Sequence, residues 1–103
     1  MEIIETSIYT QNIIKLLSDE EYLELQNFLV SNPKAGDVIQ NSGGLRKLRW
    51  KLKNKGKSSG IRNIYYFYEQ QSKLYMIYVY KKSKKDDLTP DQIKKLKKAF
   101  LGE

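Results

Sequence analysis

The chain has 103 residues, with 19 Lys or Arg and 12 Asp or Glu, so its formal net charge is +7. This length leaves room for one domain, and we expect a single domain over residues 1–103. The sequence contains no His and no Cys. It therefore excludes a Ser-His-Asp triad, a two-histidine acid–base nuclease, a disulfide framework, and metal sites built from His or Cys.

The first residues do not read as a signal peptide. A charge at Glu2 interrupts the first apolar run, which is far too short for that role. The other apolar runs are too short to span a membrane, and the absence of Cys fits a reducing compartment. We therefore expect a cytoplasmic protein that does not act on a membrane.

The charge is divided unevenly between the two halves of the chain. Residues 1–45 hold two basic and seven acidic residues, a net of −5, whereas residues 46–103 hold 17 basic and five acidic residues, a net of +12. This asymmetry indicates a polyanion-binding surface built by the second half. The alternative is a solvated, lysine-rich surface without a ligand.

The first half predicts a short strand and two helices. Residues 3–4 are expected to form the strand, and residues 6–17 carry apolar side chains at roughly helical spacing. Ser18 and Glu21 form a capping box, which starts a second helix near residue 19. That helix should end just before Pro33, because the residue before a proline disfavours helical geometry.

The apolar spacing changes from helical to alternating in the second half. Residues 33–44 are expected to form a loop, after which residues 45–53, 61–68 and 74–80 predict three strands. A hairpin turn is expected at residues 69–72. The third strand is apolar on both faces, so we expect it to be covered on both sides.

A second capping box, formed by Thr89 and Gln92, starts the last helix with Pro90 in its first turn. Its inward face is Ile93, Leu96 and Phe100. The order of elements, β-α-α-β-β-β-α, predicts an α+β fold. We expect a mostly antiparallel sheet with the two N-terminal helices on one face and a C-terminal helix.

The strand over residues 45–53 has an apolar face and a cationic face. Leu48 and Trp50 point one way, and the basic residues Lys47, Arg49, Lys51 and Lys53 point the other way. Like charges on one strand face repel each other, so an anion is expected there. The alternative is an edge strand whose lysines block aggregation. Arg62 could join this cluster across the next hairpin.

Six of the eight tyrosines fall in the last two strands. An exposed tyrosine can stack on a base while basic side chains hold the flanking phosphates, although ordinary sheet packing is the alternative for each of them. Asp86, Asp87 and Asp91 fit no calcium-loop spacing, so we interpret them as capping and solvated residues.

Several segments together resemble one known family. The segments are LSDEEY (17–22), NPKAGDVIQNSGGLRK (32–47), KGK (55–57), IRNIYYFY (61–68), LYMIYVYKK (74–82) and DLTPDQIKKL (87–96). In sequence and in element order, they resemble the RelE/ParE superfamily of toxin–antitoxin toxins, and most of all its HigB-type, RelE-like branch. The resemblance covers nearly the whole chain.

The resemblance implies a ribosome-dependent endonuclease that cuts mRNA in the ribosomal A site. In that family the 2′-hydroxyl attacks the adjacent phosphate, with Lys and Arg as the catalytic groups and with no metal or cofactor. The catalytic residues of the family fall here on Lys47, Arg49, Arg62 and Lys82. Residues expected to bind RNA or the ribosome are Arg46, Lys51, Lys53, Lys55, Lys57, Tyr66, Tyr68, Lys81, Lys84 and Lys85.

One position departs from the family pattern. Leu88 stands where RelE has a C-terminal Tyr that stacks on the substrate base, so Tyr66 or Tyr68 is the alternative stacking residue. The general base is consequently open, with Lys47 as the candidate because crowded cations make a lysine a better proton acceptor.

The resemblance also implies the partners. These are a cognate antitoxin, expected to be a small helix-turn-helix protein from the adjacent gene, together with the 30S A site and mRNA. Two other functions stay open: a ParE-like inhibitor of DNA gyrase, and an RNA-binding module that does not cleave.

Overall fold

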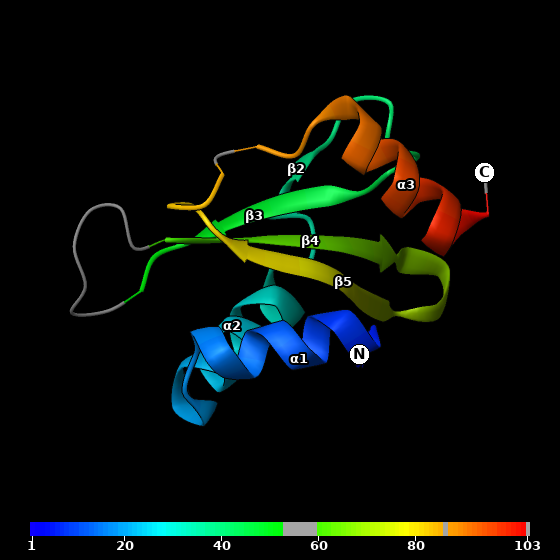
Figure 1. Ribbon diagram of the computed structural model, residues 1–103. Helices are drawn as coiled ribbons and strands as arrows, with labels where there is room; N and C mark the ends of the chain where they lie inside the picture. The colour runs from blue at the N-terminus through cyan, green and yellow to red at the C-terminus, as the bar shows by residue number, and fades with distance from the viewer. Residues whose placement is uncertain (53–59, 86, 103) are drawn as a thin grey trace.

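The computed structural model describes residues 1–52, 60–85 and 87–102. It has three layers, in which one sheet lies between two helices on one face and a third helix on the other (Figure 1). The helices are α1 (Ser7–Leu16), α2 (Asp19–Ser31) and α3 (Pro90–Leu101). The α+β architecture predicted from the sequence is confirmed, with the N-terminal helices together on one face.

Within the described residues the sheet has five strands in the order β1-β5-β4-β3-β2. Among these strands β1 runs parallel to its neighbour, β5, and the other pairs are antiparallel. The strands are β1 (Glu2–Glu5), β2 (Asp37–Val38), β3 (Arg46–Trp50), β4 (Ile61–Tyr68) and β5 (Lys73–Lys81).

Side-chain caps fix the starts of the helices. Thr6 caps α1 by accepting a hydrogen bond from the amide of Tyr9, and its hydroxyl also donates to the carbonyl of Ile77 at 2.7 Å. The capping boxes predicted at Ser18 and Thr89 are both present. The local sequence therefore sets where α2 and α3 begin.

Two apolar layers hold the sheet. The first lies under α1 and α2 and includes the fully buried Tyr9, Leu25 and Tyr65. The second lies under α3 and includes Leu45 and Ile64. As predicted, β5 contributes to both layers, so it is covered on each side.

An irregularity in β5 changes which side chains reach the α3 layer. Ile64 pairs with Tyr78 and Tyr65 pairs with Met76, which leaves Ile77 as an extra residue in β5. This β-bulge places Ile77 and Tyr78 in the same layer. The hydroxyl of the α1 cap satisfies the carbonyl of the bulged residue.

The structure corrects two sequence expectations and adds detail to a third. The segment 33–44 is not wholly a loop, because β2 forms within it and pairs with β3. The strand expected at residues 45–53 is shorter, since β3 ends at Trp50. The turn expected at residues 69–72 contains a short 3₁₀ helix, Glu69–Gln71, and ends with Ser72 in the left-handed region.

The segment between α2 and β2 is tied to β4 by two hydrogen bonds to one side chain. The hydroxyl of Tyr65 donates to the carbonyl of Pro33 at 2.8 Å and accepts from the amide of Gly36 at 2.9 Å. A Cβ on Gly36 would lie 2.8 Å from the Tyr65 ring, so this contact requires glycine. The chain thus enters β2 from a fixed point on β4.

Candidate functional site

Two rows of side chains cross the face of the sheet under α3. In the first row Arg49 of β3 pairs with Arg62 of β4, which pairs with Tyr80 of β5. In the second row Lys47 pairs with Ile64. The alternation predicted for β3 is confirmed, since Leu48 is buried in the opposite layer while Lys47 and Arg49 face α3.

A groove of about 770 Å³ runs between this face of the sheet, the segment that contains β2, and α3. That volume lies within the usual range of ligand sites, roughly 300–1,000 Å³. Its lining residues are Asp37, Val38, Ile39, Gln40, Asn41, Lys47, Arg49, Ile64, Tyr80, Asp87, Leu88, Pro90, Ile93, Lys94 and Lys97.

The three clustered cations differ in their access to this groove. Arg49 is exposed, and the side chain of Lys47 is 16% exposed. Arg62 is only 5% exposed and does not line the groove. A bound anion would therefore contact Lys47 and Arg49 directly. The buried guanidinium of Arg62 would lie beside Arg49 on the neighbouring strand.

A carboxylate lies against this cluster. The Lys47 ammonium donates a hydrogen bond to Asp87 and forms an ion pair with it. That hydrogen bond, and then the positive charges of Lys47, Arg49 and Arg62, hold the pKa of Asp87 below its ordinary value of 3.8. The site thus already accommodates an oxyanion.

The start of α3 positions this carboxylate. Thr89 caps the helix by accepting from the amide of Gln92 at 3.1 Å, and Pro90 occupies the first helical turn. Leu88 packs into the apolar layer beneath α3. Asp87 therefore comes directly before a packed side chain and a capped helix start, and its carboxylate contacts Lys47.

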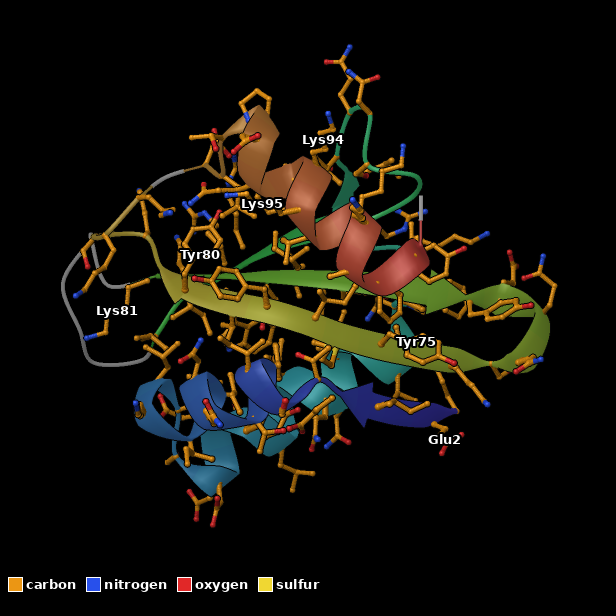
Figure 2. The ribbon with its side chains drawn as sticks, turned by 45° about the vertical axis from the view of Figure 1, so that its right-hand side comes forward. Glu2, Tyr75, Tyr80, Lys81, Lys94 and Lys95 are labelled. Atoms are coloured by element: carbon orange, nitrogen blue, oxygen red, sulfur yellow. The ribbon has the colours of Figure 1, made fainter. Side chains whose placement is uncertain are left out.

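Some sequence-predicted residues lie away from the groove. Arg46 faces the α2 side, where its guanidinium donates to the backbone carbonyls of Lys34 and Gly36. Lys81 is the last residue of β5, and Lys82, Lys84 and Lys85 follow it; the amide of Lys82 donates to the carbonyl of Gly60 at 2.9 Å. Figure 2 shows Lys81 at that end of β5, away from α3. Lys51 is exposed just after β3, and Lys53, Lys55 and Lys57 lie outside the described residues.

The two tyrosines expected to stack on a base lie at the other end of β4. Tyr66 is four residues beyond Arg62 and Tyr68 six, distances of about 13 and 20 Å along the strand. Tyr66 packs against Phe100 near the end of α3, with ring centroids 6.0 Å apart. The aromatic residue that does line the groove is Tyr80, which is 6% exposed (Figure 2).

The sequence pattern does not reveal several groove residues. It predicts Asp87 as a capping or solvated residue and Gln40 and Asn41 as loop residues, and it assigns Lys94 and Lys97 to no site. Helical spacing alone could have linked Lys94 and Lys97 to Ile93, but nothing local reveals that they face the segment around β2.

The described residues were also considered for a metal site and a membrane-spanning helix, and they contain neither. No three acidic side chains among them are placed to hold a metal ion. Within the same residues, no helix is long and apolar enough to cross a membrane.

Comparison with known proteins identifies the family. A model of the family described as "RelE toxin of RelE / RelB toxin-antitoxin system" matches residues 15–100, most of the chain. The chain belongs to the RelE toxin family. It is therefore a toxin of a toxin–antitoxin system, as the sequence segments predicted.

The RelE fold is also found by comparison with solved structures. A doubly substituted form of E. coli toxin RelE in the free state is similar, with a TM-score of 0.57 and 17% sequence identity. The match covers 82% of this chain and 86% of that chain. At this identity the similarity concerns the fold alone.

Proposed function

We propose that this RelE-family toxin is a ribosome-dependent endoribonuclease that cleaves mRNA in the ribosomal A site. The observation that carries the proposal is the cluster of Lys47, Arg49 and Arg62 on one sheet face, at a groove that admits a ligand. Two like charges at directly paired positions weaken a sheet, so a fold that retains them favours an anionic ligand there.

The proposed chemistry is an internal transesterification of the RNA strand. The 2′-oxygen of one nucleotide attacks the adjacent phosphorus, and the bond from phosphorus to the 5′-oxygen of the next nucleotide breaks. The products are a 2′,3′-cyclic phosphate and a 5′-hydroxyl. One proton leaves the 2′-hydroxyl and one reaches the departing 5′-oxygen.

Each member of the cluster has a role in this proposal. Arg49 is exposed and offers two parallel N–H donors to two phosphate oxygens. Arg62 adds positive charge from a buried position, where it stabilises the developing negative charge more strongly than in water. We assign the general base to Lys47, which must first leave Asp87 and lose its own proton before its neutral amine can accept the proton of the 2′-hydroxyl.

The remaining assignments follow the family resemblance. We place the chain in the HigB-type branch and in the cytoplasm, with a small helix-turn-helix antitoxin as its partner. Lys82 and the other basic residues around the end of β5 are proposed to contact RNA outside the groove. The sequence contains no His, which is consistent with acid–base chemistry carried by Lys and Arg.

A primer-extension map of mRNA in a reconstituted translation reaction tests the proposal. The wild-type toxin should create new 5′ ends within codons, and only when ribosomes are present. Arg62→Ala should abolish these ends. Lys95→Ala is the matched control, because Lys95 lies outside the groove and is 79% exposed. Stalled translation without new ends, or a block of DNA synthesis before protein synthesis, would contradict the proposal.

A further inference from the structure

We propose that the part of the groove between residues 37–41 and α3 is a second nucleotide subsite. It would hold the single-stranded mRNA nucleotide next to the scissile phosphate, with Lys94 and Lys97 on its phosphate and the amides of Gln40 and Asn41 on its base. This inference rests on the proposed nuclease function and adds a second nucleotide-binding position in the same groove.

The two lysines lie on one face of α3. Pro90, Ile93, Lys94 and Lys97 line the groove, and their spacing is that of a single helical stripe. Residues three apart on a helix have Cβ atoms about 5–6 Å from each other, close enough for two ammonium groups to reach one phosphate. Figure 2 shows Lys94 on the side of α3 near the segment that follows β2, and Lys95 on the other side.

The charge of the groove favours an anion beyond the catalytic cluster. Its lining includes four cations and two aspartates, a net charge of +2. Asp87 is engaged with Lys47 at the cluster. Lys94 and Lys97 extend the positive lining along α3, so a polyanion could continue from the cluster along the helix.

The opposite wall presents side-chain amides from a rigid turn. Asn41 has φ of 61°, in the left-handed region. The buried hydroxyl of Ser42 donates to the carbonyl of Ile39 at 2.6 Å, and the amide of Ile39 donates to Leu45 at 2.8 Å. Side-chain amides carry both donors and acceptors, which suits the polar edge of a base. The turn holds Gln40 and Asn41 at the groove before any ligand arrives.

Between these walls the floor is apolar. Ile64, Leu88 and Ile93 line it. Ile64 belongs to the buried layer beneath α3, Leu88 packs against that layer, and Ile93 is 7% exposed. A base has apolar faces and a polar edge, so this floor and the two amides match one base.

The first experiment measures binding of a 2′-O-methyl RNA hexanucleotide, which cannot be cleaved, at several salt concentrations. Lys94→Gln with Lys97→Gln is compared with Lys95→Gln with Lys98→Gln, a pair on the same helix that does not line the groove. Both double variants lose two positive charges. Any difference between them therefore reports position and not net charge.

The groove pair should weaken binding about tenfold more than the control pair at low salt. For the Lys94→Gln, Lys97→Gln variant, the slope of log K against log salt should be less negative than that of the wild type by about 0.7–1.4. This is the change expected for one or two lost phosphate contacts on a single strand. Equal losses in the two pairs would overturn the subsite. A loss of antitoxin binding without loss of RNA binding would also overturn it.

The second experiment tests the amides on programmed ribosomes. Asn41→Gly keeps the left-handed backbone accessible and removes only the amide, and Gln40→Ala is its companion. Both should redistribute cleavage among codons. Gln70→Ala is the control, because Gln70 has an exposed side-chain amide in the turn between β4 and β5. This variant should keep the wild-type cleavage pattern. An unchanged pattern in the groove variants would overturn base reading.

The outcomes separate this inference from the proposed function. If wild-type toxin cleaves no mRNA on ribosomes, the nuclease proposal fails. If wild-type toxin cleaves, and the groove variants behave like their controls in both experiments, only the second subsite fails.

Discussion

Arg49 and Arg62 occupy directly opposed positions on two antiparallel strands, with their side chains on the same face of the sheet. Like charges at such positions destabilise a sheet. The negative charge of Asp87 compensates them, since both guanidinium groups contribute to lowering the pKa of that carboxyl after the larger effect of Lys47. The Arg49–Arg62 pair therefore favours an oxyanion beside it.

The first prediction concerns the protonation of Asp87. Its pKa in the folded toxin lies below 3.8 because Lys47 hydrogen-bonds to its charged form. A lowered pKa contributes stability above pH 3.8, and this contribution is lost as the pH falls through the folded-state value. Because the Asp87 side chain is 65% exposed, we expect only a small change in the free energy of unfolding.

A ¹³C NMR titration of the side-chain carboxyl measures this directly. Lys47→Met should raise the Asp87 pKa toward 3.8, whereas Lys95→Met should leave it unchanged. If Lys47→Met has no effect, the ion pair is not the cause of the shift.

The second prediction is that Asp87 competes with RNA phosphate for the cluster. Asp87→Asn removes a negative charge from a point where a phosphate is proposed to bind, and it releases Lys47. We expect two- to fivefold tighter binding of the 2′-O-methyl RNA hexanucleotide, roughly the effect of one exposed ion pair. Asp91→Asn makes the same charge change on α3 outside the groove, where Asp91 pairs with Lys95. Equal tightening by both variants would show only a net-charge effect.

The third prediction concerns the layer beneath α1 and α2. The hydroxyl of Tyr9 donates to the side-chain carbonyl of Asn63 at 2.7 Å, and both residues are fully buried. Tyr9→Phe leaves that oxygen without this donor, which should lower the free energy of unfolding by about 1–3 kcal/mol. In urea unfolding, the midpoint should fall while the slope stays the same.

The half-buried Tyr75 provides the comparison for this variant. It packs against Phe100 on the other face of the sheet, with ring centroids 5.1 Å apart (Figure 2). Tyr75→Phe should change stability by less than about 0.5 kcal/mol. Equal losses in the two variants would mean that the Tyr9–Asn63 hydrogen bond contributes nothing specific.

Local sequence signals predicted most of the secondary structure. Ser18 and Thr89 each predict a helix start, because each forms a capping box with the residue three positions later in the chain. The alternation in β3 predicted which face Lys47 takes. In contrast, β2 exists only because β3 supplies its hydrogen-bonding edge, and two residues with exposed side chains carry no pattern of their own.

The candidate site was predicted less completely, because its partners are distant in sequence. Asp87 contacts Lys47 across 40 residues, and no local feature distinguishes it from a solvated aspartate. Tyr66 and Tyr68 share the strand of Arg62, but where the groove lies along that strand depends on where α3 crosses the sheet. Chain topology brings Lys94 and Lys97 to the groove, and spacing along one helix cannot show that.

The last prediction separates binding from catalysis at Arg49. Its exposed guanidinium lines the groove beside Lys47 and is proposed to hold two phosphate oxygens at once. A lysine keeps the charge but cannot reproduce the planar pair of donors. Losing one such transition-state contact typically lowers the rate about 100–1000-fold. Arg49→Lys should therefore bind ribosomes like the wild type and lose most cleavage.

Single-turnover cleavage on programmed ribosomes, with ribosome binding measured separately, tests this expectation. Arg49→Ala should remain folded, because the side chain is exposed and its removal relieves repulsion with Arg62. Lys95→Arg is the control, since it exchanges the same two side chains in reverse outside the groove. Wild-type cleavage by both Arg49 variants would remove Arg49 from the site. Weakened ribosome binding by Arg49→Lys, with cleavage of the bound fraction unchanged, would make Arg49 a docking residue instead of a catalytic one.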